Sequence, residues 1–214
     1  NMGGTILGTS REKPFKKRSA ASQNKPALML KTIKEMQLDC LVCIGGNGTQ
    51  KTAAKLAQAG VNIVTIPKTI DNDLPCTERT FGFDTAVACA TEAVDRLHTT
   101  AESHHRVMAL EVMGRYAGWI ALYSGIAGGA DVILLPEIPY NIDSVIEKIE
   151  QRRKDGKNFS IVVVAEGAKP IGGELSVARV VKGSFEPIRL GGAGERLVRE
   201  IEGRTGIESR CTVL

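Results

Sequence analysis

Two aspartates separated by one residue give the sequence its clearest chemical signal. Residues 63–73 read Ile-Val-Thr-Ile-Pro-Lys-Thr-Ile-Asp-Asn-Asp, so Asp71 and Asp73 follow an apolar run that stops at Pro67. In an extended loop their side chains would lie on the same side, where two like charges are costly unless a cation or a reacting proton uses them. The spacing favours chemistry in which one carboxylate acts as a base and the other faces a metal.

A glycine-rich turn precedes this stretch. Residues 45–49 read Gly-Gly-Asn-Gly-Thr and join a predicted strand to a predicted helix, so backbone N–H groups can approach an anion closely at the helix start. The turn has no Gly-Lys-Ser/Thr as in a Walker A loop, and Lys51 replaces the third glycine of a dinucleotide fingerprint. Taken alone, it also fits a structural tight turn. Together with the two aspartates it indicates phosphoryl transfer, which needs an anion cradle, a metal and a base.

Apolar runs and helical patterns alternate along the chain and supply the elements that would position these residues. The sequence predicts strands at 38–44, 61–66, 107–112, 132–135 and 159–165, and helices at 51–58, 85–100, 117–127, 142–153 and 194–202, the last stopping at Gly203. The loop-rich stretch 168–190 receives no assignment. This alternation predicts an α/β fold with mostly parallel sheets and helices on both faces.

The composition is that of a globular protein. The chain has 214 residues, of which 43% are hydrophobic and 24% charged, enough for one large domain or two smaller ones. No stretch approaches the length of a membrane span. The net charge of +4 is not gathered into a long basic run. We therefore expect no membrane and no nucleic acid as partner, and an anionic small substrate fits.

Five cysteines are scattered through apolar surroundings, which suits a reducing cytosol better than a disulfide scaffold. Cys40 and Cys43 form a C-x-x-C pattern inside a predicted strand, and no second Cys or His pair completes a metal site. We therefore expect both in the core. The chain begins at Asn1 and stops at Leu214 within a strand-like run, so both termini are expected to be cuts.

Five segments, in order, resemble the signatures of the 6-phosphofructokinase family. They are Gly-Gly-Thr-Ile-Leu-Gly-Thr-Ser-Arg (3–11), Gly-Gly-Asn-Gly-Thr (45–49), Pro-Lys-Thr-Ile-Asp-Asn-Asp (67–73), Glu-Val-Met-Gly-Arg (111–115) and Ala-Glu-Gly (165–167). The resemblance covers nearly the whole chain except 168–194 and implies a fragment lacking both ends of the family's chain. It further implies two doubly wound, Rossmann-like lobes. Residues 1–82 would form part of the phosphoryl-donor lobe, and residues 83–214 the fructose 6-phosphate lobe.

The resemblance also implies a role for individual residues in phosphoryl transfer from ATP to the 1-hydroxyl of fructose 6-phosphate. Asp71 would be the general base, and Thr69 would position the transferred phosphate. Asp73, together with Asn47, would hold Mg²⁺. Arg11 and Arg115 would neutralise the negative charge on the phosphoryl group during its transfer. The residues that would bind the phosphoryl donor are Gly46, Asn47, Gly48, Thr49 and Lys68.

Further matched positions concern the sugar phosphate. The residues that would bind it are Thr69, Asp71, Met113, Gly114, Arg115 and Glu166. Glu166 would do so by accepting hydrogen bonds from sugar hydroxyls. Arg106 and Arg210 match arginines that reach the 6-phosphate from a neighbouring subunit; from the residues alone, both also fit solvated charges flanking strands. The resemblance thus implies a cytoplasmic glycolytic enzyme that forms a homodimer or homotetramer with shared active sites.

Three positions leave the donor and the activity open. Asn47 stands where many family members have aspartate, which removes a charge from the expected Mg²⁺ site. Gly48 is typical of ATP-using members, since an aspartate there would obstruct the nucleotide, whereas Lys68 is typical of pyrophosphate-using ones. We expect ATP, with pyrophosphate as the second possibility. The residues also fit a non-catalytic sugar-phosphate-binding homologue, or an NAD or lipid kinase with the same glycine turn, although the Met-Gly-Arg segment argues against such a kinase.

Overall fold

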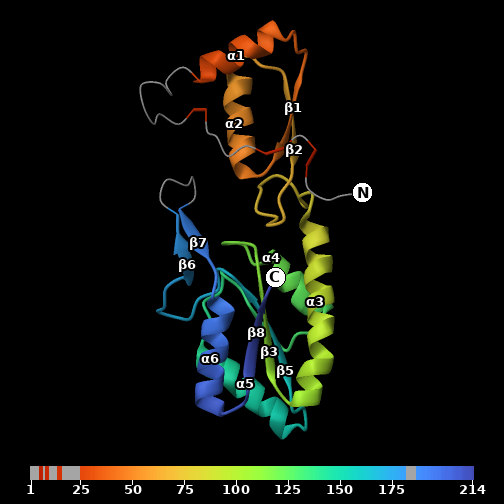
Figure 1. Cartoon of the computed structure of the whole chain (residues 1–214), viewed down its shortest axis with the longest axis vertical. Coiled ribbons are helices and arrows are strands. Elements are labelled where there is room, and N and C mark those ends of the chain that lie inside the picture. Colours follow the sequence, from red (N-terminus) through yellow and green to blue (C-terminus); the bar gives the residue numbers. More distant parts are fainter. Residues whose placement is uncertain (1–4, 7, 10–13, 16–24, 182–186) are drawn as a thin grey trace. The chain divides into compact units, whose positions relative to one another are not determined.

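The chain folds into two compact units. The structure, a computed structural model, describes residues 5, 6, 8, 9, 14, 15, 25–181 and 187–214. Unit 1 is Asn1–Lys68 and unit 2 is Thr69–Leu214 (Figure 1). The division falls at Lys68 rather than at residue 82 because the backbone N–H of Thr69 donates to the carbonyl of Phe81 at 3.1 Å. Residues 69–82 therefore belong with unit 2, and the ligand of each unit stays a prediction.

Unit 1 contains a parallel pair of strands covered by a helix. β1 (Leu41–Gly45) pairs with β2 (Ile63–Pro67), with Leu41 opposite Ile63 and Gly45 opposite Pro67. The connecting helix α2 (Asn47–Gln58) buries its small apolar face, Ala53 and Leu56. It begins four residues before the predicted position 51, because the glycine turn itself forms the cap and first turn. Helix α1 (Lys25–Glu35) was not predicted.

The predicted core position of the C-x-x-C cysteines is wrong for Cys40. β1 starts only at Leu41, so Cys40 precedes the strand and is exposed, while Cys43 is half-buried. Exposure alternates along β1, as expected for a strand with one covered face. Val42 and Ile44 are 56% and 55% exposed, so the face opposite to that of Cys43 is not covered by the described residues.

Unit 2 is built on a four-stranded parallel sheet with the strand order β4-β5-β3-β8. Its strands are β3 (Val107–Val112), β4 (Val132–Leu134), β5 (Ser160–Ala165) and β8 (Ser209–Val213). Its helices are α3 (Phe83–His104), α4 (Trp119–Ala127), α5 (Ile142–Lys154) and α6 (Ala193–Thr205). None of the described helices has both the length and the apolar content of a membrane span.

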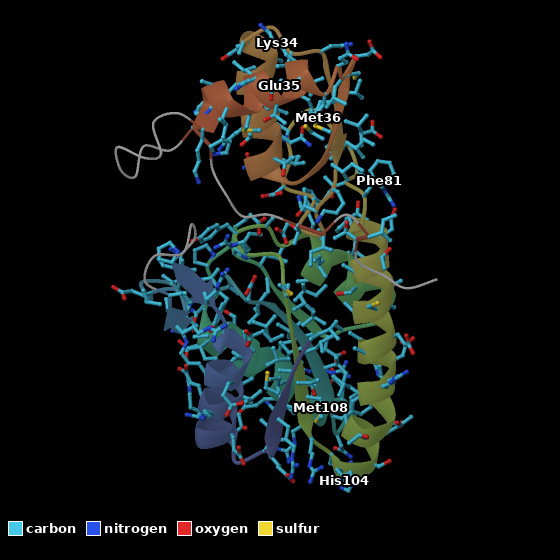
Figure 2. All side chains as sticks on the ribbon, turned by 45° about the horizontal axis from the view of Figure 1, so that its top comes forward. Lys34, Glu35, Met36, Phe81, His104 and Met108 are labelled. Atoms are coloured by element: carbon cyan, nitrogen blue, oxygen red, sulfur yellow. The ribbon has the colours of Figure 1, made fainter. Side chains whose placement is uncertain are left out.

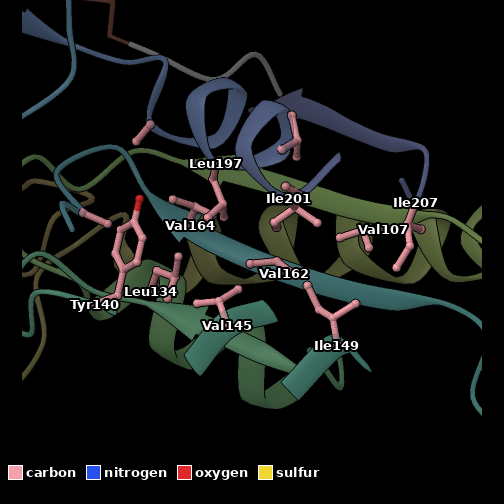
Figure 3. Close-up of a cluster of buried hydrophobic side chains, with 14 residues drawn as sticks. Val107, Leu134, Tyr140, Val145, Ile149, Val162, Val164, Leu197, Ile201 and Ile207 are labelled. Carbon is pink, nitrogen blue, oxygen red and sulfur yellow. The ribbon is translucent and has the colours of Figure 1, made fainter. Parts of the chain in front are cut away.

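Helices cover both faces of this sheet, and every residue of β3 and β5 is buried. Val107, Val162 and Val164 point to one face, where they pack with side chains of α5 and α6 (Figure 3). The alternate residues of the same strands, such as Leu110 and Val163, pack with α3 and α4 on the other face. The period of two along each strand thus produces two apolar layers. The predicted α/β class with mostly parallel sheets is confirmed.

The stretch without a predicted structure contains a β-hairpin. β6 (Val177–Val180) pairs antiparallel with β7 (Ile188–Leu190). Every residue of β6 is exposed, so this strand lacks the apolar run that marks the buried strands. Sequence periodicity therefore carries no signal for it.

Helix ends differ from the prediction where the cap lies beyond the apolar pattern. α6 continues through Gly203 to Thr205, so the predicted stop at Gly203 is wrong. The helix ends instead at Gly206, whose φ of 69° is the left-handed conformation that glycine adopts at little cost. α3 is likewise longer than predicted, and His105, also left-handed, caps it.

A carboxylate lies inside the sheet of unit 2 and ties it to a helix. The Glu111 side chain on β3 is only 1% exposed. Its two oxygens accept the backbone N–H groups of Gly192 and Gly194, at 2.9 and 2.8 Å, where α6 begins. A helix start leaves such N–H groups without carbonyl partners, and its positive dipole end favours a negative charge. Glu111 therefore joins β3 to α6 and was not singled out from the sequence.

We expect Glu111→Gln to lower the free energy of unfolding by about 1–3 kcal/mol, because an amide nitrogen replaces one acceptor and leaves a buried N–H without a partner. Denaturant unfolding followed by circular dichroism measures the change. Glu150→Gln on α5, where the side chain is exposed, is the matched control and should change stability by less than about 0.5 kcal/mol. Equal losses for the two variants would contradict the capping role of Glu111.

Candidate active site

The glycine turn of unit 1 forms the start of α2. Gly46 is the residue before the helix, and Asn47, Gly48 and Thr49 form its first turn. Backbone N–H groups of a first helical turn have no intrahelical acceptor and can bind an anion. A side chain at Gly45 is excluded, because a Cβ atom there would lie 2.3 Å from Oγ1 of Thr49. The predicted donor-binding residues of the turn are thus held together in one short segment.

Lys68 lies beside this turn within unit 1. Its backbone N–H donates to the carbonyl of Gly45 at 3.0 Å, at the carboxyl ends of the paired strands β1 and β2. The Gln50 side chain reinforces the junction by donating from Nε2 to the carbonyls of Gly45 (3.0 Å) and Ile66 (3.3 Å). Parallel strands bring their carboxyl ends to one edge, where open α/β sheets bind ligands. Gln50 was not singled out from the sequence, which gives no sign that its amide spans two strands.

The two aspartates of unit 2 lie in a turn, not in an extended loop. Asn72 between them has a φ of 51°, in the left-handed region, so the expected extended arrangement is wrong. The hydroxyl of Thr69 donates to Oδ2 of Asp71 at 3.3 Å and accepts the backbone N–H of Asp71 at 3.2 Å. Thr69 thus holds both the backbone and the carboxylate of Asp71.

Several groups perturb the carboxyl group of Asp71. Burial raises its pKa above the ordinary range, and the nearby charge of Asp73 raises it further. The charge of Glu166 acts in the same direction, while the Thr69 hydrogen bond and the positive charge of Arg115 lower it. The influences that raise the pKa prevail, because the charged form of a carboxyl group is disfavoured when the group is partly out of water and next to like charges. Asp71 is therefore a better proton acceptor than an ordinary aspartate.

Asp73 differs from Asp71 in its surroundings. Asp73 is exposed, whereas Asp71 is half-buried. Mg²⁺ in phosphoryl-transfer sites uses one or two carboxylates, several waters and the phosphates of the substrate. Asp73 fits that requirement. Asn47, the other predicted ligand, lies in unit 1.

The Met113–Arg115 segment and Glu166 meet at the carboxyl ends of β3 and β5. These strands are parallel neighbours, and the backbone N–H of Arg115 donates to Oε1 of Glu166 at 2.8 Å. The approach is close, because a Cβ atom at Gly167 would lie 2.0 Å from the carbonyl oxygen of Arg115. Gly114 and Arg115 have φ values of 135° and 56°, so the chain turns sharply there. Glu166 thus has the partner that a carboxylate at the end of a buried strand needs.

Arg106 and Arg210 lie at the other end of this sheet. Arg106 precedes the first residue of β3, so it is roughly 20 Å along the strand from Met113. His104 and Met108, which flank it in sequence, lie at the opposite end of unit 2 from Phe81 (Figure 2). The structure therefore does not bring Arg106 and Arg210 together with Glu166 in one chain.

A shared carboxylate holds the two arginines. Glu208 binds Nε of Arg106 at 2.8 Å and Nη2 of Arg210 at 2.8 Å. These contacts, with Arg106 first and then with Arg210, hold the pKa of Glu208 below its ordinary value. Arg106 is 16% exposed and Arg210 is 60% exposed, so Arg106 is not the fully solvated charge considered from the sequence. Arg11, the remaining predicted site residue, lies outside the described residues.

Comparison with known proteins identifies the family of the chain. The sequence model described as phosphofructokinase matches residues 1–214. The chain belongs to the phosphofructokinase family. It is 60% identical, over 100% of its length and 59% of the relative's, to ATP-dependent 6-phosphofructokinase 3 of Bacteroides thetaiotaomicron. It is 53% identical, over 99% of its length and 60% of the relative's, to a pyrophosphate–fructose 6-phosphate 1-phosphotransferase of Amycolatopsis mediterranei.

A solved phosphofructokinase structure shares the fold. The structure of phosphofructokinase from Saccharomyces cerevisiae matches with a TM-score of 0.78 and 30% identity, over 99% of this chain and 29% of that chain. The chain spans about 60% of the length of the two curated phosphofructokinase relatives. The family predicted from the five sequence segments is confirmed. Because relatives with both donor names are similar to this chain, family membership does not choose between ATP and pyrophosphate.

The raised pKa of Asp71 predicts how the stability of this chain depends on pH. The native state binds the Asp71 proton more tightly than the unfolded state, so stability falls as pH rises from the unfolded pKa through the native one. Asp71→Asn should therefore raise the melting temperature at pH 7. The gain should vanish below pH about 4, where Asp71 is protonated in both states.

Thermal unfolding of both proteins at pH about 3.5–8 measures this difference. Asp95→Asn on α3, where the carboxylate is exposed, is the control and should leave the melting temperature unchanged at all these pH values. An Asp71→Asn protein that is less stable than the wild type at pH 7 would show that the native state favours the charged form.

Proposed function

We propose that the protein containing this chain is a 6-phosphofructokinase. It transfers a phosphoryl group from ATP to the 1-hydroxyl of fructose 6-phosphate and yields fructose 1,6-bisphosphate, a step of glycolysis. The observation that carries the proposal is the environment of Asp71, whose carboxyl group has a raised pKa, accepts a hydrogen bond from Thr69 and is influenced by the charges of Glu166 and Arg115. A relative named for this reaction, 60% identical to the chain, supports it.

Asp71 is the general base of the proposed reaction. It takes the proton of the 1-hydroxyl while that oxygen forms a bond to the terminal phosphorus of the donor and the bond from this phosphorus to the ADP oxygen breaks. Thr69 orients the carboxylate through its 3.3 Å hydrogen bond and also helps to position the transferred group. Arg115, together with Arg11, neutralises the charge on that group. Most of the rate enhancement comes from orientation and charge neutralisation.

The sugar phosphate binds against the carboxyl ends of β3 and β5. One oxygen of Glu166 accepts the Arg115 N–H, so the other oxygen can accept hydrogen bonds from sugar hydroxyls. Met113, 52% exposed, and Gly114 form the adjoining wall. Arg106 and Arg210 lie at the opposite end of the sheet. They therefore bind the 6-phosphate of the substrate in the active site of a neighbouring subunit, within a homodimer or homotetramer.

Unit 1 binds the donor through Gly46, Asn47, Gly48, Thr49 and Lys68. Gly48 has no side chain and leaves space for the α-phosphate of ATP, which favours ATP as the donor. Lys68 and the pyrophosphate-named relative favour pyrophosphate as the second candidate. The residues that would hold Mg²⁺ are Asp73, with a carboxylate, and Asn47, with a neutral amide oxygen, and the ion would supply positive charge to the donor phosphates. We place the enzyme in the cytoplasm, where glycolysis takes place.

The full-length protein should phosphorylate fructose 6-phosphate, and Asp71→Asn should lower kcat by roughly 100- to 10,000-fold, because the amide cannot accept the proton. A coupled assay with ATP and, in parallel, with pyrophosphate measures both points and identifies the donor. Calorimetric titration with fructose 6-phosphate should show nearly unchanged binding. An Asp71→Asn enzyme with full activity would remove the assignment of the base, and a wild type that binds the sugar phosphate without turnover would favour a non-catalytic homologue.

Co-expression of two inactive variants tests the shared site. In hybrids of Asp71→Asn and Arg106→Ala chains, one site combines the intact Asp71 of one subunit with the intact Arg106 of the other. The hybrids should therefore be more active than either variant expressed alone. The assay uses fructose 6-phosphate at a concentration below its KM. Hybrids of Asp71→Asn and Glu166→Gln are the control, because both residues come from the same subunit and no intact site forms. Equal activity in the two hybrids would contradict the role of Arg106 across the subunit boundary.

A further inference from the structure

Asn72, between the two aspartates, has a positive φ, and both the nitrogen and the oxygen of its side-chain amide form hydrogen bonds. Its φ of 51° is a conformation that asparagine adopts more readily than most residues. Its Nδ2 donates to the carbonyl of Glu78 at 3.2 Å, and its Oδ1 accepts the backbone N–H of Thr80 at 2.9 Å. Asn72 therefore binds a segment that follows it by six to eight residues.

Thr80 ties the same segment to the other side of Asp71. The Thr80 side chain is buried, with the residue 4% exposed. Its hydroxyl donates to the carbonyl of Thr69 at 2.7 Å and lies 3.4 Å from Oδ1 of Asn72. Because one hydroxyl has one proton, the shorter contact is the hydrogen bond. Asp71 thus lies between two residues, Thr69 and Asn72, that are both held by Thr80.

This clamp, formed by Asn72 and Thr80, is anchored in the apolar core of unit 2. The N–H of Phe83, at the start of α3, donates to the carbonyl of Thr80 at 3.2 Å. Phe83 is 1% exposed and packs in the layer that contains Leu110 and Ile120. Rigid core packing is therefore transmitted through Thr80 to the turn that carries Asp71.

We propose that Asn72 and Thr80 are positioning residues that fix the direction of the Asp71 carboxylate toward the reacting hydroxyl. The inference rests on the proposed function for its effect on turnover, whereas the clamp itself is independent of the reaction. Neither residue needs to touch the substrate. Loss of the clamp should displace the base by a fraction of an ångström to an ångström, which slows proton transfer and leaves the sugar-phosphate contacts of Glu166 and Arg115 in place.

Two variants remove the clamp with little change in shape. Thr80→Val replaces the hydroxyl by a methyl group, and Asn72→Gly removes the amide while still allowing the positive φ. In the full-length enzyme, each should lower kcat by about 10- to 100-fold and change the KM for fructose 6-phosphate by less than about threefold. Thr80→Ser keeps the hydroxyl and should restore kcat to within about threefold of the wild type.

Thr77→Val is the matched control. Its hydroxyl donates to the carbonyl of Arg79 at 3.0 Å, in the same segment, but bonds neither Thr69 nor Asn72. It should retain the wild-type kcat. A general loss of folded protein would lower the calorimetric binding stoichiometry for fructose 6-phosphate, so kcat is calculated per binding-competent site.

A second measurement does not depend on turnover. Amide hydrogen exchange of the Asp71 N–H, which donates to the Thr69 hydroxyl at 3.2 Å, should be faster in Asn72→Gly and Thr80→Val than in Thr77→Val, because the loosened segment opens this hydrogen bond more often. An unchanged exchange rate, an unchanged kcat, or a raised KM with normal kcat would each overturn the positioning role. A wild type without phosphotransfer would instead overturn the proposed function, and the exchange rate would still decide whether the clamp holds Asp71.

Discussion

The parallel pairing of β3 and β5 is the constraint on which the second unit depends. Both strands are buried on both faces, so their register cannot slip without moving two apolar layers at once. Since the strands run in the same direction, the segments that follow them emerge at the same edge, where the Arg115 N–H meets Glu166 at 2.8 Å. Two short segments that lie far apart in sequence thereby form one continuous surface.

A second feature is that the fold holds a carboxylate where its charge is disfavoured. Asp71 is partly buried next to Asp73 and within the influence of Glu166, and all three effects oppose its ionisation. The hydrogen bonds of Thr69 and the anchoring of Asn72 on Thr80 keep this unfavourable arrangement in place. An unfavourable local free energy that the surrounding structure offsets is typical of functional sites, where reactivity matters more than stability.

The chemistry implied by the family is distributed over separate parts of the chain. The helix start at Gly46–Thr49 and Lys68 belong to unit 1, while Asp71 and Glu166 belong to unit 2. The paired arginines on Glu208 lie at the amino ends of the strands, away from the edge that carries Glu166. Such a distribution suits an enzyme whose binding energy comes from several directions around the substrate, and it is the reason for proposing that Arg106 serves a site shared between subunits.

The amino-acid sequence predicted the α/β class, the buried strands and the family correctly, because long apolar periodicity and five short motifs are local properties of the chain. It did not reveal the exposed strand β6, which lacks an apolar run, or the left-handed φ at Asn72, and it did not choose between Gly203 and Gly206 as the end of α6. The partners of Glu111 and Thr80 depend on contacts between segments that lie far apart in the sequence or follow a turn. A buried carboxylate or hydroxyl must find a hydrogen-bond partner, and which one it finds depends on backbone groups that the fold brings close from distant positions in the chain.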